Sequence, residues 1–260
     1  MRLSSWQLHD AVWRLRSLRS DGLVVSDVDD WVLSTVISAF GSYAPASHLN
    51  SFPSHSLSPA TVSVLRNKAS GFGAAGSRTT EQAEEARAHC ERLVDSLDDQ
   101  AVQIWTDGSA NPNPSPAGAG AWILFPDGAS VEASSALGNG TNNLGELWAI
   151  GSGLERTVQH PSFRNSMNIH GFTDSEYALG ILSKGWRAGD YSYIATAIRN
   201  LIREHSLCLN FHKVAAHAGI PGNERADRLA ARGTEVSMGI GYPPDLKCIL
   251  MDYGFVGLDC

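Results

Sequence analysis

The sequence predicts an α/β fold, a five-stranded mixed sheet flanked by helices and preceded by a small helical region. Three observations indicate this class. Short runs in which apolar and polar side chains alternate are typical of strands, and longer runs with apolar side chains three or four residues apart are typical of helices. After residue 100, three strand-like runs come first, and helices and strands then follow in mixed order. That order favours a mixed sheet covered by helices.

The start of the chain contains two segments of different composition. Residues 1–40 have helical spacing with Trp6 and Trp13 on an apolar side, so a helical region is expected there. Residues 41–80 are rich in Ser, Pro and Gly and poor in large apolar residues, which predicts a linker. The Arg- and Ser-rich start also has the composition of an organelle presequence, but we favour an ordinary amphipathic helix because the helical pattern continues.

The chain is expected to enter the sheet through a helix. Residues 81–100 have helical spacing, and Thr79 with Gln82 forms a candidate capping box just before them. We place the α/β domain at residues 101–236. Residues 237–260 form a C-terminal tail with enough apolar side chains to dock on another surface.

The α/β domain opens with a strand in which Val102 and Ile104 alternate with Gln103 and Trp105. A PDG turn at 126–128 joins the next two strands as a hairpin. The remaining runs follow from the same two spacings. The expected elements are strands at 101–109, 118–125 and 129–137, a helix at 142–158, a strand at 167–173, helices at 175–183 and 193–205, a strand at 207–214 and a helix at 223–233.

The composition excludes several classes of protein. The 260 residues carry a formal charge of −7, so contact with nucleic acid would depend on local clusters of basic residues. No apolar run approaches the length that spans a membrane. The four cysteines are far apart and form no CxxC pair. This fits reduced thiols in an intracellular protein, cytoplasmic or nuclear, better than a disulfide framework or a zinc site.

Four acidic residues stand out by position. Asp107 is expected to end the first strand and Asp174 the fourth, while Glu146 and Asp227 lie on helices. Loops and helix termini converge at one edge of an α/β sheet, so ligands bind there. A cluster of carboxylates without Cys or metal-spaced His predicts hard divalent cations, Mg²⁺ or Mn²⁺. Two such ions about 3.5 to 4 Å apart can promote hydrolysis of a phosphodiester.

Each of these residues alone also has an ordinary structural explanation. The DGS sequence at Asp107 is a common turn, and Asp174 could cap a helix. Glu146 could be a surface acid, and Asp227 could pair with a neighbouring arginine. His217 opens a Gly-rich turn, where it could cap the turn or swing toward a substrate. The residues alone leave these alternatives open.

Four longer motifs contain these residues. They are TDGSANPNPSPAGAGAW, TNNLGELWAI, FTDSEYALGIL and HAGIPGNERADRLA, and the resemblance that they carry covers residues 101 to about 234. Their order resembles that of type 1 ribonuclease H. The resemblance implies a ribonuclease H-like fold for residues 101–236. It also implies an endonuclease that hydrolyses the RNA strand of RNA–DNA hybrids with two Mg²⁺ ions, or Mn²⁺, and leaves 3′-hydroxyl and 5′-phosphate ends.

The resemblance implies roles for single residues in the reaction. Asp107, Glu146, Asp174 and Asp227 match the family's metal-binding carboxylates. His217 matches a histidine that assists proton transfer and departure of the cleaved phosphate. The resemblance therefore implies a catalytic set of four acids and one histidine.

Recognition of the hybrid would depend on a second set of residues. A protein that detects RNA in a hybrid needs short donors and acceptors for 2′-hydroxyls in the minor groove. The resemblance gives this task to Asn113, Asn142 and Asn143, and a DNA-strand phosphate to Thr141. For these polar residues, turn formation and helix capping are the alternatives. Trp186 resembles an aromatic of the DNA-strand channel, although a core tryptophan is equally compatible with the sequence.

The sequence departs from many bacterial members of the family in two places. Their Lys- and Trp-rich helical protrusion is replaced by the short LSKGWRAGDYS, and Glu176 stands where many members have an uncharged residue. Affinity for the hybrid could then depend on residues 1–40. This segment could equally pack on the catalytic domain or mediate self-association.

Two other functions stay open at this point. A noncatalytic hybrid-binding or interaction protein could keep the fold without turnover, although the presence of all four acids and His217 argues against loss of activity. The chain could also be the ribonuclease H part of a retroelement polyprotein that works beside a polymerase.

Overall fold

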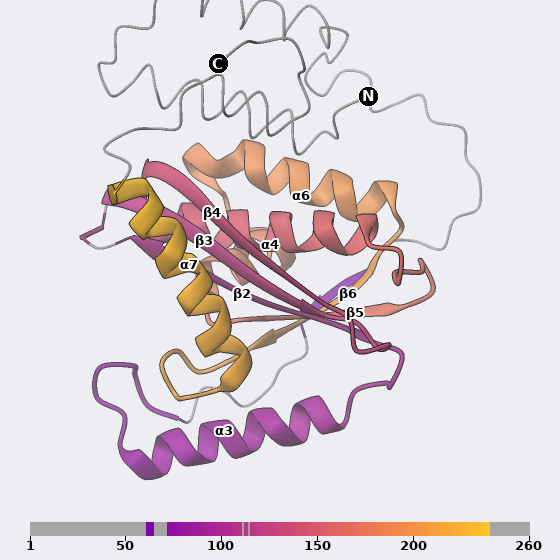
Figure 1. Cartoon of the computed structure of the whole chain (residues 1–260), viewed down its shortest axis with the longest axis horizontal. Coiled ribbons are helices and arrows are strands. Elements are labelled where there is room, and N and C mark those ends of the chain that lie inside the picture. Colours follow the sequence, from indigo (N-terminus) through magenta and orange to yellow (C-terminus); the bar gives the residue numbers. More distant parts are fainter. Residues whose placement is uncertain (1–60, 65–71, 111, 114, 240–260) are drawn as a thin grey trace, which may run out of the picture.

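The computed structural model describes residues 61–64, 72–110, 112–113 and 115–239 of the chain (Figure 1). Several expectations lie outside these ranges. They are the helical region and possible self-association at 1–40, residues 41–60 and 65–71 of the linker, and the tail from residue 240 onward.

A mixed sheet forms the centre of the described chain (Figure 1). Its strands are β1 Thr61–Val64, β2 Val102–Ala110, β3 Ser115–Leu124, β4 Ser130–Gly140, β5 Asn168–Thr173 and β6 Cys208–Lys213. The six strands lie in the order β1-β6-β5-β2-β3-β4. The pairs β2–β3 and β3–β4 are antiparallel, whereas β2–β5, β5–β6 and β6–β1 are parallel. The prediction of a mixed α/β sheet is confirmed.

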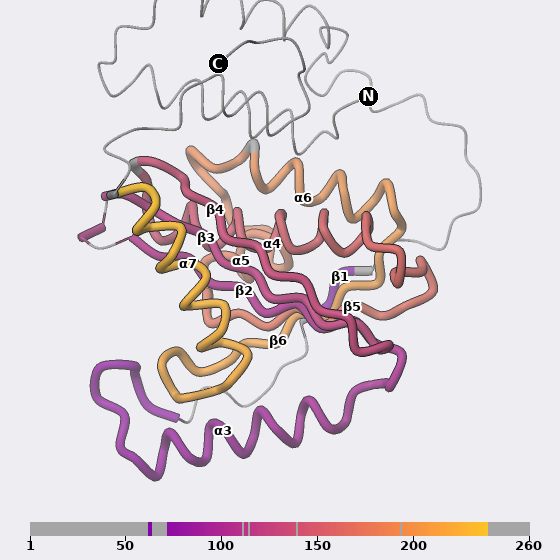
Figure 2. The backbone as a smooth tube through the Cα atoms, viewed as in Figure 1, coloured from indigo at the N-terminus to yellow at the C-terminus, as the bar shows by residue number. Residues whose placement is uncertain are grey.

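The sheet has one strand more than the five that the sequence pattern indicates. Residues 61–64 were expected in a linker, but they form β1, which pairs with β6 from Thr61↔Cys208 to Val64↔Phe211. Figure 2 shows this segment beside β6 although it is distant in the sequence. The sequence of β1 is TVSV, rich in β-branched residues, which is too short a run to stand out in Ser-rich surroundings.

Helices cover both faces of the sheet. They are α3 Thr80–Asp95, α4 Asn142–Gln159, α5 Glu176–Ser183, α6 Ser192–Glu204 and α7 Pro221–Gly239, with a 3₁₀ turn, η2, at Gly189–Tyr191. In Figure 1, α4 and α6 lie on one side of the sheet, and α3 and α7 lie on the other. Within the described ranges, no helix combines the length and the apolar character needed to cross a bilayer.

Two apolar clusters hold these layers together. The larger one joins α4, α5 and α6 to the sheet and includes Leu147, Ile181 and Ile198, all fully buried. The smaller one joins α3 and α7 to the opposite face, where Trp105 of β2 and Phe172 of β5 stack with ring centroids 4.0 Å apart. With helices packed on both faces of the sheet, most residues of β2 and β5 are buried, polar residues among them.

Helix α3 begins where the capping box was predicted. The Thr79 side chain accepts a hydrogen bond from the Gln82 backbone N–H at 3.2 Å, and the Gln82 side chain accepts one from the Thr79 N–H at 3.0 Å. The helix then buries Ala86 and Cys90 against the smaller cluster. Helix α3 is therefore packed into the folded domain, and does not merely precede it in the chain.

Candidate active site

Asp107 lies inside β2, not at its end as the sequence pattern indicated. The reason is that the two neighbours of β2 stop at different points. Parallel pairing with β5 stops at Trp105↔Phe172, but antiparallel pairing with β3 continues through Asp107↔Gly120 and beyond. Asp107 therefore lies just past the end of the parallel pairing, at the edge of the sheet where β5 also ends.

Asp174 follows β5 directly, as expected. β5 ends at Thr173, and Asp174 is the next residue, half-buried, before helix α5 begins at Glu176. Ser175 caps that helix by accepting a hydrogen bond from the Ala178 N–H at 3.1 Å. Because Ser175 caps α5, Asp174 does not cap it, although the sequence left that role open for Asp174.

Glu146 reaches the same edge from the second turn of α4. This requires the helix to approach β2 closely, and glycines at Gly108 and Gly145 permit it. A Cβ on Gly108 would lie 2.3 Å from the Glu146 backbone nitrogen, and one on Gly145 would lie 2.5 Å from the Gly118 carbonyl oxygen. Glu146 is only 7% exposed, so it is not a surface acid, which was the ordinary structural explanation for it.

Three carboxylates meet at this edge of the sheet. One oxygen each from Asp107, Glu146 and Asp174 lies within 4.8 Å of the other two. Asp107 and Glu146 are buried and Asp174 is half-buried. A compact group of carboxylate oxygens is the donor set that Mg²⁺ and Mn²⁺ prefer.

Asp227 lies outside this set of three. It is half-buried on α7, and it approaches Asp107 closely enough to repel its charge and to share a hydrogen bond. The four acids predicted from the sequence thus converge as a group of three with Asp227 beside it. Their roles as metal ligands stay a prediction.

The electrostatics of the group follow from burial and like charge. Burial, and then repulsion from Asp174 and Asp227, raises the pKa of Asp107 from 3.8 to about 8. Burial, and then repulsion from Asp107, raises the pKa of Glu146 well above its ordinary value. Burial also raises the pKa of Asp174. A bound cation would offset the repulsion among the carboxylates, so these three side chains together favour binding of a cation.

His217 is exposed in the turn that precedes α7, and it lies close enough to Asp174 for a charge on its ring to oppose in part the burial that raises the pKa of that carboxyl. Its backbone has a φ of 49°, in the left-handed region that few residues other than glycine adopt. Gly219, two residues on, has a φ of 73°. Glycine adopts such a φ freely, whereas His217 needs surrounding contacts to hold it there.

The residues predicted to recognise a hybrid fall into two places. Asn113 and Asn142 meet at the start of α4, where the Asn113 side-chain oxygen accepts a hydrogen bond from the Asn142 N–H at 3.3 Å. Asn143 is exposed beside them. Thr141 caps α4 by accepting from the Leu144 N–H at 3.2 Å. Thr141 therefore caps the helix, which was the alternative that the sequence left open for it.

Trp186 lies elsewhere, in the segment after α5. Its side chain is 46% exposed, so it is not a core tryptophan. Its ring packs on Gly180, where an added Cβ would lie 2.1 Å from a ring carbon. The Lys184 ammonium lies 5.3 Å from the ring centroid. An aromatic face beside a cation is thus presented to solvent.

Two side chains near the carboxylates were missed by the sequence reasoning. The Asn223 amide is 2% exposed and donates a hydrogen bond to Asp174 Oδ2 at 3.4 Å. The Thr173 hydroxyl donates to Glu146 Oε2 at 3.5 Å. Asn223 had a signal, because it lies four residues before Asp227 and so shares its helix face.

The mixed sheet gathers carboxylates at one edge and places the histidine-bearing turn beside them. This arrangement is typical of α/β enzymes that hydrolyse phosphodiesters with divalent cations. A family model, that of RNase H, matches residues 99–235 of this chain. The match covers more than half of the 260 residues, and the chain belongs to the RNase H family.

Curated relatives agree with the family match. The ribonuclease H of Bordetella bronchiseptica is 33% identical over 164 residues, covering 57% of this chain and 99% of the relative. The ribonuclease HI of Synechocystis is 34% identical over 144 residues, covering 50% of this chain and 85% of the relative. Among solved structures, LC11-RNase H1 in complex with an RNA/DNA hybrid is 25% identical, covering 53% of this chain and 99% of that chain, with a TM-score of 0.46.

Proposed function

We propose that this chain is an endonuclease that hydrolyses the RNA strand of RNA–DNA hybrids with the help of two divalent cations. The products carry 3′-hydroxyl and 5′-phosphate ends. The observation that supports this function most strongly is the approach of the Asp107, Glu146 and Asp174 carboxylates to within 4.8 Å of one another, in a chain of the RNase H family.

The donor set fits Mg²⁺ best. All the ligands are carboxylate oxygens, and the buried charges repel one another when no cation is near. Asp107, Glu146 and Asp174 would hold the cations, with Asp227 completing the group from α7. Mn²⁺ has similar ligand preferences and can take its place. When bound, two such ions supply an activated water and charge stabilisation at the leaving oxygen of the phosphate.

The bonds that change define the products. The water oxygen bonds to phosphorus while the bond from phosphorus to the 3′ oxygen breaks, which leaves a 3′-hydroxyl on one fragment and a 5′-phosphate on the other. The chain's own residues fix the geometry for this displacement. Asn223 and Thr173 hold the Asp174 and Glu146 carboxylates through hydrogen bonds of 3.4 Å and 3.5 Å.

His217 acts beside this group. It is exposed and close to Asp174, where a charge on its ring opposes in part the burial that raises the pKa of that carboxyl. An imidazole can take up or release a proton near neutral pH. We assign it to proton transfer and to the departure of the cleaved phosphate, with its side chain exposed in the turn before α7.

The start of α4 recognises the hybrid. Asn113, Asn142 and Asn143 are exposed there and present short amides suited to 2′-hydroxyls in a minor groove. Glu146 follows one helical turn later, so contact with the RNA strand and the reaction are coupled through one short segment. Trp186 offers its exposed ring to the DNA strand.

Thr141 can hold a phosphate while it caps the helix. Its hydroxyl oxygen accepts from the Leu144 N–H and lies 2.8 Å from the Tyr191 hydroxyl. A hydroxyl oxygen accepts two hydrogen bonds and donates one. If Leu144 and Tyr191 both donate, the Thr141 proton remains available for a phosphate oxygen. Tyr191 therefore joins the proposed phosphate site.

The function is tested with an end-labelled RNA–DNA hybrid, duplex RNA, duplex DNA and single strands, each in Mg²⁺ and each with a chelator. We expect cleavage of the hybrid alone, only in Mg²⁺, with ends that a ligase and a phosphatase identify. Binding of the hybrid without cleavage would instead favour the noncatalytic hybrid-binding protein.

Two matched variants separate the site from the fold in this assay. Asp107→Asn is expected to abolish cleavage, whereas Asp95→Asn, at the exposed end of α3, is expected to leave it unchanged. Cleavage by Asp107→Asn at the normal rate would refute the assigned role of that carboxylate.

A further inference from the structure

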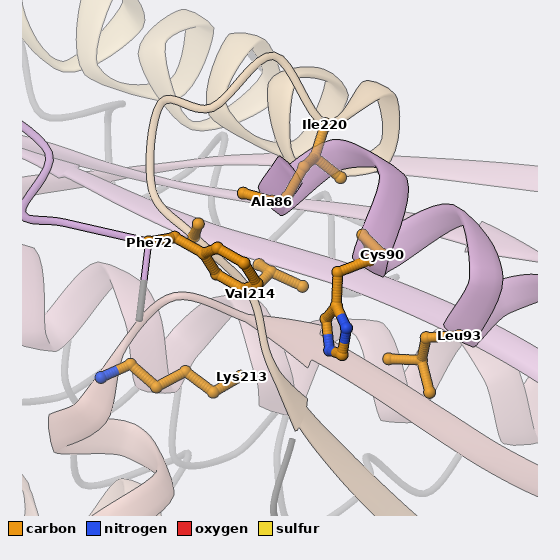
Figure 3. Close-up of a pocket in the computed structure, with 9 residues that line it drawn as sticks. Phe72, Ala86, Cys90, Leu93, Lys213, Val214 and Ile220 are labelled. Carbon is orange, nitrogen blue, oxygen red and sulfur yellow. The ribbon is translucent and has the colours of Figure 1, made fainter. Parts of the chain in front are cut away.

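Helix α3 lies before the part of the chain that matches the family model, which begins at residue 99. It nevertheless contacts the turn that carries His217. Its apolar residues form one cluster with Val214 and Ile220, which flank that turn on its two sides. Figure 3 shows Ala86 and Cys90 of α3 gathered with Phe72 around Val214 and Ile220. The helix is therefore packed against the base of the turn.

Arg78, just before α3, ties this segment to the turn through its guanidinium. Its Nε donates to the Phe72 carbonyl at 2.8 Å, and another guanidinium nitrogen donates to the Gly73 carbonyl at 3.2 Å. The remaining terminal nitrogen donates to the carbonyl of Ala216, the residue directly before His217. Because a guanidinium is planar and rigid, anchoring two of its nitrogens fixes the direction of the third.

Arg87 and Glu224 hold the other end of the same turn. A Cβ on Gly219 would lie 2.9 Å from an Arg87 guanidinium nitrogen, so the Arg87 side chain lies directly against Gly219. From the α7 side, the Glu224 carboxylate accepts a hydrogen bond from the Gly219 N–H at 3.2 Å. The turn is contacted on both sides, at the residues that flank His217.

We propose that Arg78 is a positioning residue that holds the His217 turn in its working conformation, and this inference rests on the proposed nuclease function. The turn needs such support because His217 has a φ of 49°, which unsupported L-residues rarely adopt. Arg78 does not act on the substrate. It acts by keeping the Ala216 carbonyl, and with it the His217 backbone, in one place.

The kinetic test is a double-mutant cycle on the full chain. Arg78→Met keeps the aliphatic stem and removes the hydrogen bonds, and His217→Ala removes the group that Arg78 positions. We expect Arg78→Met to lower kcat about tenfold with KM within about twofold of the wild-type value, and to have almost no further effect in the His217→Ala background. Equal effects in both backgrounds would show a merely structural role and overturn the proposal.

Two further variants sharpen the cycle. Arg78→Lys, which can still reach one carbonyl, is expected to recover part of the lost kcat. Arg92→Met is the matched control, because Arg92 is exposed in the last turn of α3, roughly 20 Å along the helix from Arg78. A loss of kcat in Arg92→Met as large as in Arg78→Met would also overturn the proposal.

Hydrogen–deuterium exchange tests the contact without any need for activity. Arg78→Met is expected to speed exchange in peptides that cover residues 214–220, and Arg92→Met is not. If the wild-type chain cleaves no hybrid, the proposed function fails, and the exchange result alone decides whether Arg78 holds the turn. Unchanged exchange in Arg78→Met refutes the positioning role whatever the activity.

Discussion

Gly108 of β2 and Gly145 of α4 touch, so that a Cβ on Gly145 would lie 2.8 Å from the Gly108 Cα. This contact brings the first turns of α4 against the strand and places Glu146 beside Asp107. A larger residue at either position would have to push the helix away from the sheet. The distance between two carboxylates therefore depends on two residues that carry no functional group.

Gly145→Ala tests that relationship. The new methyl would meet the Gly118 carbonyl at 2.5 Å, so we expect a loss of stability of about 1 to 3 kcal/mol and a fall in hybrid cleavage larger than the stability loss explains. Thermal unfolding and initial cleavage rates measure the two effects. Gly76→Ala is the control, because nothing lies within 4 Å of its Cβ position. Normal activity in Gly145→Ala would mean that the site tolerates displacement of α4.

The pH dependence of stability tests the charge repulsion. Asp107 has its pKa raised to about 8, so the folded state binds a proton there that the unfolded state releases near pH 4. The stabilisation from that proton is present at low pH and is lost as pH rises through 8. In chelator, we expect stability to fall by about 1 kcal/mol per pH unit between roughly pH 6.5 and 8.

Mg²⁺ and Asp107→Asn should each reduce this slope. Mg²⁺ replaces the proton as the positive partner, and the asparagine has no charge to neutralise. Denaturant unfolding at several pH values measures the slope for both proteins. A flat profile for the wild-type chain in chelator would contradict the buried repulsion.

Trp186→Ala tests the exposed aromatic. The ring lies on Gly180 and is open to solvent, so it can stack on a nucleic acid without supporting the core. We expect KM for the hybrid to rise about fivefold to tenfold with kcat nearly unchanged. Met238→Ala, another exposed large apolar side chain, provides the control. An unchanged KM would remove Trp186 from the binding surface.

Much of the fold could be predicted because its elements have strong local patterns. The strand around Val102 and Ile104 and the helix that begins after Thr141 follow the spacings of their side chains. β1 could not be predicted in this way. Its four residues are held as a strand by pairing with β6, which lies more than a hundred residues later and leaves no local signal.

The sequence identified the residues of the site better than it identified how they are arranged in space. Side-chain type and order indicated Asp107, Glu146 and Asp174, but their approach depends on where each strand stops pairing. Asp107 lies in the interior of β2 because β3 pairs with β2 further along the strand than β5 does. The contact of Tyr191 with Thr141 joins residues fifty positions apart and has no sequence pattern.

The most direct test of the central claim is a calorimetric titration of the chain with Mg²⁺, repeated for Glu146→Gln and for the exposed control Glu204→Gln. If the three carboxylates hold the cations, the wild type and the control bind Mg²⁺ and release protons near neutral pH, whereas Glu146→Gln binds far more weakly. Equal Mg²⁺ binding by Glu146→Gln and the wild type would contradict the proposed metal site.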